Sequence, residues 1–165
     1  MKKVIKNYLA KLQENDKKGF SLVELIIVMA IMAILVGIVA SQVLPYMEKS
    51  RMSKDQQQLS SLCTDIVSAI SQADGTVTSF GPTQLSSCDT TTGGADWVTE
   101  LGLLRSSDGT TATPVATIES NITGKFKSKT AKASPDISVE YNNTTGQVTV
   151  YCAGGTVDKL KVVSE

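Results

Sequence analysis

The sequence of 165 residues contains no histidine, few aromatic residues and only three cysteines. Without imidazole, a His-based catalytic triad and most zinc sites are excluded. The cysteines are scattered, with no Cys-x-x-Cys spacing, so they are a poor set of metal ligands. The chain also lacks a phosphate-binding Gly-Lys-Ser/Thr loop and a Gly-x-Ser-x-Gly turn. We therefore expect no enzyme, no metal and no cofactor.

Charged residues are also few, and they are unevenly placed. The 16 basic and 16 acidic residues cancel over the whole chain. Residues 1–19, however, contain six lysines and two acidic residues, whereas the remainder has 10 basic and 14 acidic residues. A basic N-terminus before an apolar run is typical of a protein inserted with that end in the cytoplasm. We expect residues 1–19 to be a basic leader peptide.

One long apolar run follows the leader. It extends from Phe20 to Leu44, and Glu24 is its single charged residue. As a helix it would be about 37 Å long, enough to cross a hydrocarbon core of about 30 Å. The small residue Gly19 lies before this run, whereas a secretory signal is cut after its apolar region. Cleavage after Gly19 would therefore leave the apolar helix on the mature protein.

Residues 17–25, Lys-Lys-Gly-Phe-Ser-Leu-Val-Glu-Leu, together with the apolar run, resemble the prepilin signature of type IV pilins and pseudopilins. The resemblance implies that a membrane aspartyl peptidase cuts after Gly19 and that the new N-terminal residue, Phe20, is methylated. It also implies that Glu24 pairs with the Phe20 amine of a neighbouring subunit and so sets the axial offset between helices.

The position of Glu24 supports a special role on physical grounds as well. A carboxylate in the middle of a bilayer costs about 2.5 to 3.5 kcal/mol and needs a cationic partner. The amine that cleavage creates at Phe20 is the natural candidate. The alternative is that Glu24 extends into the lipid headgroups near the membrane edge.

Gly37 and Pro45 are candidates for a helix kink. Pilins often have a proline inside the apolar helix, but here Ser41 occupies that position and Pro45 follows four residues later. Two alternatives remain: the helix kinks or unwinds between Gly37 and Pro45, or Pro45 only bends the helix where it leaves the membrane.

Beyond Pro45 the pattern predicts that the helix continues, now amphipathic, to about residue 73, where Asp74-Gly75 ends it. Asp55 is among the polar residues expected on its solvated face. The apolar residues expected to face the core are Met52, Leu59, Leu62, Ile66 and Ile70.

A connector is expected over residues 75–113, rich in Gly, Ser and Thr. Within it, the apolar pattern of residues 95–101 predicts a short helix that ends at Gly102. Trp97, Leu101 and Leu104 are expected to face the core. An antiparallel sheet over residues 114–163 follows, with strands at 114–120, 137–142, 147–152 and 157–163 and a hairpin turn at 142–146.

The predicted architecture is therefore α+β. A long N-terminal helix has a protruding apolar half, residues 20–44, and an amphipathic half packed on the sheet. Residues 45–165 form the globular domain. The order of elements also resembles the pilin fold.

Cys63, Cys88 and Cys152 permit at most one internal disulfide, and its connectivity cannot be read from the sequence. Many pilins have such a bond in their C-terminal region, and Cys88 with Cys152 is our candidate pair. A basic cluster at Lys125, Lys127, Lys129 and Lys132 is either a solvated loop or a contact for nucleic acid or anionic surfaces.

The sequence thus predicts a type IV prepilin, which polymerises after cleavage into an extracellular pilus used for adhesion, surface motility, aggregation or DNA uptake. The resemblance implies as partners further copies of the chain, a prepilin peptidase with methyltransferase activity, and the assembly platform with its ATPase. The precursor is expected in the cytoplasmic membrane, as a single-pass protein. Alternatives are a minor pilin, a pseudopilin of a secretion or competence system, and an extracellular binding module on a membrane tether.

Overall fold

The computed structural model describes residues 20–94, 96–152 and 160–164. The expected leader with Gly19, and residues 157–159 of the last expected strand, lie outside the described residues. The chain divides into two compact units, Met1–Pro45 and Tyr46–Glu165.

A single helix of 51 residues, α2 (Leu22–Gln72), includes the apolar run and the amphipathic stretch, as predicted. It ends one residue before the expected end, and Gly75 then adopts a positive φ of 115° that an L side chain would disfavour. The glycine therefore allows the chain to turn away from the helix.

The sheet has four antiparallel strands in the order β1-β2-β3-β4, which confirms the α+β prediction. The strands are β1 (Phe80–Gln84), β2 (Ile137–Asn142), β3 (Gln147–Cys152) and β4 (Lys161–Val163). The hairpin between β2 and β3 is the expected one. Its turn is closed by a 2.8 Å hydrogen bond from the Gly146 N–H to the Asn142 carbonyl, with Gly146 at φ 70°.

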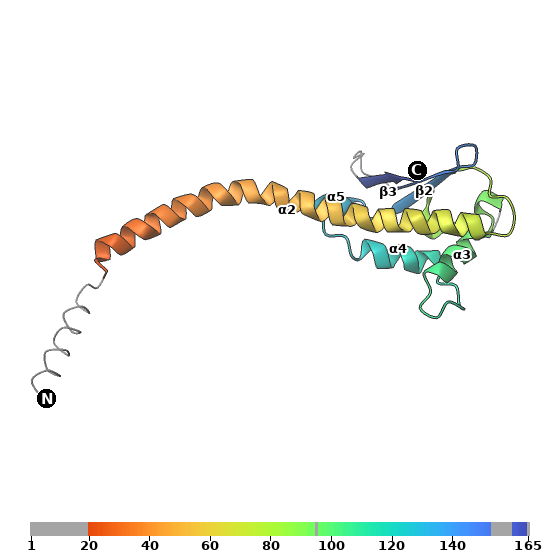
Figure 1. Ribbon diagram of the computed structural model, residues 1–165, viewed down its shortest axis with the longest axis horizontal. Coiled ribbons are helices and arrows are strands. Elements are labelled where there is room, and N and C mark those ends of the chain that lie inside the picture. Colours follow the sequence, from red (N-terminus) through yellow and green to blue (C-terminus); the bar gives the residue numbers. More distant parts are fainter. Residues whose placement is uncertain (1–19, 95, 153–159, 165) are drawn as a thin grey trace, which may run out of the picture. The chain divides into compact units, whose positions relative to one another are not determined.

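In the second unit, the sheet lies on one side of α2, and helices α3 (Trp97–Leu104) and α4 (Val115–Thr123) lie on the other (Figure 1). The core between these layers includes the fully buried α2 residues Leu59, Leu62 and Ile66. Met52 and Ile70, expected in the same stripe, are only half-buried. Most of the predicted stripe is thus the core face of the helix.

The strand expected over residues 114–120 is wrong, because this segment forms helix α4. Val115, Ile118 and Ile122 are buried at three- and four-residue spacing, which is the period of a helix and not of a strand. Pro114 precedes the first helical residue, where its missing N–H costs nothing.

Strand β1 was not expected, since Gly81 and Pro82 weaken the strand pattern. It lies at the edge of the sheet, where proline is tolerated because no further strand needs its N–H. The connector prediction was right for Trp97 and Leu101, which are fully buried in α3. It was wrong for Leu104, which is 45% exposed, and for Gly102, which lies inside the helix.

Trp97 anchors the connector to the sheet. Its ring stacks on Phe80 with centroids 5.5 Å apart and an interplanar angle of 6°, and its Nε1–H donates to the Thr92 carbonyl at 2.8 Å. The short 3₁₀ turn η2 (Thr92–Gly94) that supplies this carbonyl has Gly93 at φ 77°. The buried Trp97 side chain therefore fixes η2, the turn that precedes α3.

The expected disulfide between Cys88 and Cys152 does not form: these two residues and Cys63 are separate, buried thiols. Each packs as a small apolar side chain. The Cys63 Sγ faces the Val148 carbonyl at 3.6 Å, and the Cys88 Sγ faces the Gln84 carbonyl at 3.5 Å. Burial raises the pKa of all three thiols, to about 11 for Cys88 and Cys152.

Candidate functional site

Of the residues predicted for processing and assembly, Phe20 lies just before α2 and Glu24 lies in its first turn, while Gly19 is outside the described residues. Phe20 is 88% exposed. The Glu24 carboxylate accepts a hydrogen bond from the Ser21 N–H at 2.9 Å, and the Ser21 Oγ accepts one from the Val23 N–H at 3.4 Å. This is a capping box, in which the side chains of a serine before the helix and of a glutamate three residues later accept hydrogen bonds from backbone N–H groups at the helix start.

Sequence reasoning missed this role of Glu24, although Ser-x-x-Glu before an apolar run is its known signal. The cap uses Oε2 of the carboxylate. Among the described residues, Oε1 has no recorded hydrogen bond. Glu24 is therefore held against the backbone of Ser21, the residue after Phe20, and its Oε1 has no hydrogen-bond partner in the described part of the chain.

The apolar part of α2 is exposed along its whole length. No residue from Leu22 to Leu44 is buried in the chain, and the helix is long and apolar enough to cross a membrane. Large exposed apolar side chains mark surfaces that something else covers. Those with the largest exposed fractions are Leu22 73%, Met29 68%, Ile34 64% and Leu44 67%.

Gly37 and Pro45 both lie within the assigned helix. Pro45 has no N–H to donate to the carbonyl four residues earlier, that of Ser41. Separately, the Ser41 Oγ donates to the Ile38 carbonyl at 2.8 Å, and nothing lies within 4 Å of a Cβ placed on Gly37. The candidate kink region thus combines a missing backbone hydrogen bond with an open helix surface.

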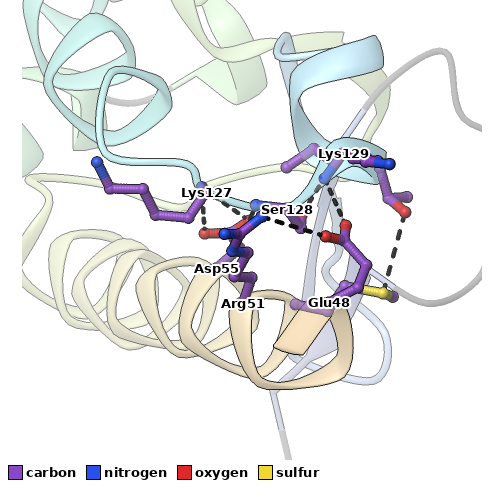
Figure 2. Close-up of polar contacts among 9 residues, drawn as sticks. Glu48, Arg51, Asp55, Lys127, Ser128 and Lys129 are labelled. Carbon is purple, nitrogen blue, oxygen red and sulfur yellow. Dashed lines mark hydrogen bonds and ion pairs between the residues drawn. The ribbon is translucent and has the colours of Figure 1, made fainter. Parts of the chain in front are cut away.

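A second group of polar side chains lies in the part of α2 that belongs to the second unit (Figure 2). The Asp55 carboxylate is 1% exposed and accepts hydrogen bonds from the backbone N–H groups of Lys127 at 3.0 Å and Ser128 at 2.8 Å. The Glu48 carboxylate accepts one from the backbone N–H of Lys129. We call Glu48 and Asp55 together the carboxylate clamp.

The clamp holds the start of the short helix α5 (Lys129–Ala133) against α2. The Ser128 side chain caps α5 by accepting from the Ala131 N–H at 3.2 Å. The Arg51 guanidinium lies 3.9 Å from Glu48, a weak and exposed pair. The prediction that Asp55 lies on the solvated face of the helix was therefore wrong, since its partners are backbone groups with no signature in the sequence.

Glu119 of α4 has a similar arrangement. It is 6% exposed and accepts hydrogen bonds from the backbone N–H groups of Ser86 and Ile137, both at 2.8 Å. It joins α4 to the 3₁₀ turn η1 (Leu85–Ser87) and to β2. The two buried acidic side chains, Asp55 and Glu119, thus bind backbone amides of distant segments.

A family model described as the prokaryotic N-terminal methylation motif matches residues 15–40. This stretch includes Gly19, Phe20, the capping box and most of the exposed apolar helix. The search of curated proteins and the search of solved structures each gave no match. Residues 15–40 therefore carry the type IV prepilin signature.

Proposed function

We propose that this chain is a type IV prepilin, a structural subunit that polymerises into an extracellular pilus after cleavage between Gly19 and Phe20. One observation carries the proposal: the methylation motif includes the start of an apolar helix that the described residues leave exposed. Cleavage before Phe20 would keep this helix on the mature protein.

The exposed apolar surface determines what the subunit must bind. In the membrane, lipid chains cover the residues from Leu22 to Leu44. Outside the membrane, water contact with this surface would be unfavourable, and a bundle of the same helix from other copies removes that contact. Contacts that repeat head to tail without closing give an open helical filament. The partner implied is therefore a further copy of the chain.

Glu24 and Phe20 form the charge pair that orders this bundle. Cleavage converts the Phe20 nitrogen into a positive amine, and methylation leaves it positive. The capping box orients Glu24 through Oε2, so that Oε1 is available to the amine of a neighbouring Phe20. In an apolar bundle an unpaired carboxylate is costly, which favours the one axial offset at which every pair forms.

Processing and assembly require other proteins. The precursor lies in the cytoplasmic membrane with its N-terminus inside, where a prepilin peptidase with methyltransferase activity acts on Gly19 and Phe20. An assembly platform and its ATPase then move the subunit from the membrane into the fibre. Adhesion, surface motility, aggregation and DNA uptake are the activities of such filaments.

The test separates the charge of Glu24 from its helix cap. Gly19→Val, Glu24→Gln and Ser21→Ala are each expressed without a wild-type copy, and surface fibres are imaged. Glutamine at this position can still complete a capping box, so Glu24→Gln removes the charge and keeps the cap. Ser21→Ala is the matched control, because it removes the Ser21 Oγ from the cap and leaves the carboxylate in place.

We expect Gly19→Val to accumulate as uncleaved precursor, Glu24→Gln to be cleaved but form few fibres, and Ser21→Ala to form fibres at near wild-type number. Fibres of normal number and length from Glu24→Gln would contradict the charge pair. A wild-type chain found only in trace amounts in sheared fibres would instead favour a minor pilin or pseudopilin.

A further inference from the structure

The basic cluster of the sequence lies beside the carboxylate clamp. Lys125, Lys127, Lys129 and Lys132 are all exposed, and the clamp bonds join this segment to α2 across 73 and 81 residues of sequence. On α2 itself, the residues next to the clamp are Lys49, Arg51 and Lys54, which are also exposed. We call these seven residues the basic face.

The clamp leaves the basic face positively charged. Glu48 and Asp55 accept hydrogen bonds from backbone N–H groups of residues 127–129, not from the lysine ammonium groups. In Figure 2 the Lys127 side chain extends away from Asp55. Among the described residues, the ion pairs are Arg51 with Glu48 and Arg105 with Asp65, so none of the lysines is paired. Seven basic residues against two acidic ones give a net charge of five.

Chain connectivity places this charge close to the membrane. Glu48 follows Leu44, the last residue of the apolar run, by four residues within one helix, which corresponds to about 6 Å of rise. The headgroup region on each side of a bilayer is about 5 to 7 Å thick. The Lys129 amide is bonded to Glu48, so the lysine segment is attached to α2 only four residues beyond the apolar run.

Tyr46 is a second feature that fits a membrane interface. It is 71% exposed and follows the apolar run by two residues, and the Lys49 Nζ lies 5.8 Å from the centre of its ring. Tyrosine and basic residues gather at membrane interfaces, where an aromatic ring meets the headgroups and a cation meets phosphate.

We propose that the basic face binds the headgroup phosphates of anionic phospholipids at the outer surface of the membrane while the precursor awaits assembly. The proposal rests on the membrane-anchored precursor of the proposed function. Nucleic acid is the other polyanion that a basic face fits. The lipid is favoured because the clamp ties the lysine segment to Glu48, four residues beyond the apolar run. The aromatic residue between the lysines, Phe126, is buried and cannot stack on bases.

The experiment uses the full, uncleaved chain reconstituted in vesicles of phosphatidylcholine, with or without a fraction of phosphatidylglycerol. A fluorophore is attached through Ala133→Cys, at an exposed residue next to Lys132, and quenched by a lipid with a nitroxide on its headgroup. The native thiols are buried, with raised pKa, and react slowly. We expect stronger quenching in the anionic vesicles, lost at high salt because ions screen the attraction.

Variants identify the residues. Lys127→Glu with Lys129→Glu should abolish the dependence on phosphatidylglycerol, because the side-chain charge is reversed while the backbone N–H groups of the clamp are kept. Arginine at the same two positions should retain it. Lys161→Glu, in the exposed part of β4, is the control and should also retain it. Near-ultraviolet circular dichroism from Trp97 verifies that each variant is folded. If the double glutamate variant does not fold, Lys127→Gln with Lys129→Gln is used in its place.

Equal quenching in the two kinds of vesicle would overturn the proposal, and so would loss of the dependence in the arginine variant. Binding of duplex DNA to the chain in neutral vesicles, without any effect of phosphatidylglycerol, would assign the basic face to nucleic acid instead. The measurement uses unassembled precursor. If quenching does not depend on the lipid although the same protein forms fibres on cells, this inference is wrong and the proposed function is unaffected.

Discussion

The Asp55 carboxylate and the backbone N–H of Ser128 are joined by a hydrogen bond of 2.8 Å, although 73 residues separate them in the sequence. The same carboxylate also accepts from the Lys127 N–H at 3.0 Å. Both oxygens are buried with the side chain, 1% of which is exposed. Hydrogen bonds to a charged, desolvated group are stronger than those between neutral groups, so this contact fixes the segment before α5 onto α2.

Asp55→Asn should lower the free energy of unfolding by about 2 kcal/mol, since an amide can accept from one backbone N–H but presents its NH₂ group to the other. Denaturant unfolding of the full chain in detergent, followed by Trp97 fluorescence, measures this. Asp136→Asn, at an exposed carboxylate, should change the free energy by less than about 0.5 kcal/mol. Equal stabilities of the two variants would show that the clamp contributes little.

Gly93→Ala should destabilise the chain more than Gly109→Ala. Both glycines have a positive φ, 77° and 67°, so the backbone strain of an added Cβ is similar. At Gly93 that Cβ would also lie 2.9 Å from the Val77 Cγ1, whereas nothing lies within 4 Å at Gly109. We expect about 1 kcal/mol for Gly109→Ala and about 2 to 3 kcal/mol for Gly93→Ala, measured by thermal unfolding. The reverse order would contradict the packing described around Trp97.

The buried thiols should react slowly with iodoacetamide. Burial raises the pKa of Cys88 and Cys152 to about 11, helped by the charges of Asp89 and Glu119 near Cys88 and of Asp55 near Cys152. Because the thiolate is the nucleophile, the native rate at pH 8 should be roughly 100-fold below that of the unfolded chain, whose thiols ionise near 9. The native rate should keep rising with pH beyond 9. Alkylation as fast as in the unfolded chain would contradict the burial.

The same shift has a consequence for stability. A thiol whose pKa is raised in the folded chain stabilises it fully below the unfolded pKa, and this contribution is lost as pH rises toward the folded value. The free energy of unfolding should therefore fall between about pH 9 and 11. The fall should be smaller in a variant with Cys88→Ser and Cys152→Ser, and an equal fall would assign the effect to other groups.

Local patterns in the sequence were enough to predict α2, the hairpin between β2 and β3, and the burial of Trp97. Each depends on a period or a turn within a few residues. The segment after Pro114 was misread because Val115, Thr117 and Ile118 are β-branched and favour strands, whereas the burial of Ile122 one turn later decides for a helix. A longer window would have shown the helical period.

The clamp could not be predicted in the same way. Asp55 stands in a polar stretch of α2 and has the sequence context of a solvated residue. Its partners are backbone N–H groups, which every non-proline residue possesses, so no residue type marks them. The capping box of Ser21 and Glu24 is different, because its Ser-x-x-Glu spacing is visible in the sequence.

The most direct test of the account is mass spectrometry of the chain recovered from sheared surface fibres. We predict an intact mature chain that begins with methylated Phe20 and so retains the apolar helix, in the amount expected of the main fibre component. A recovered chain that lacks residues 20–44, or one that still carries the leader through Gly19, would contradict the account.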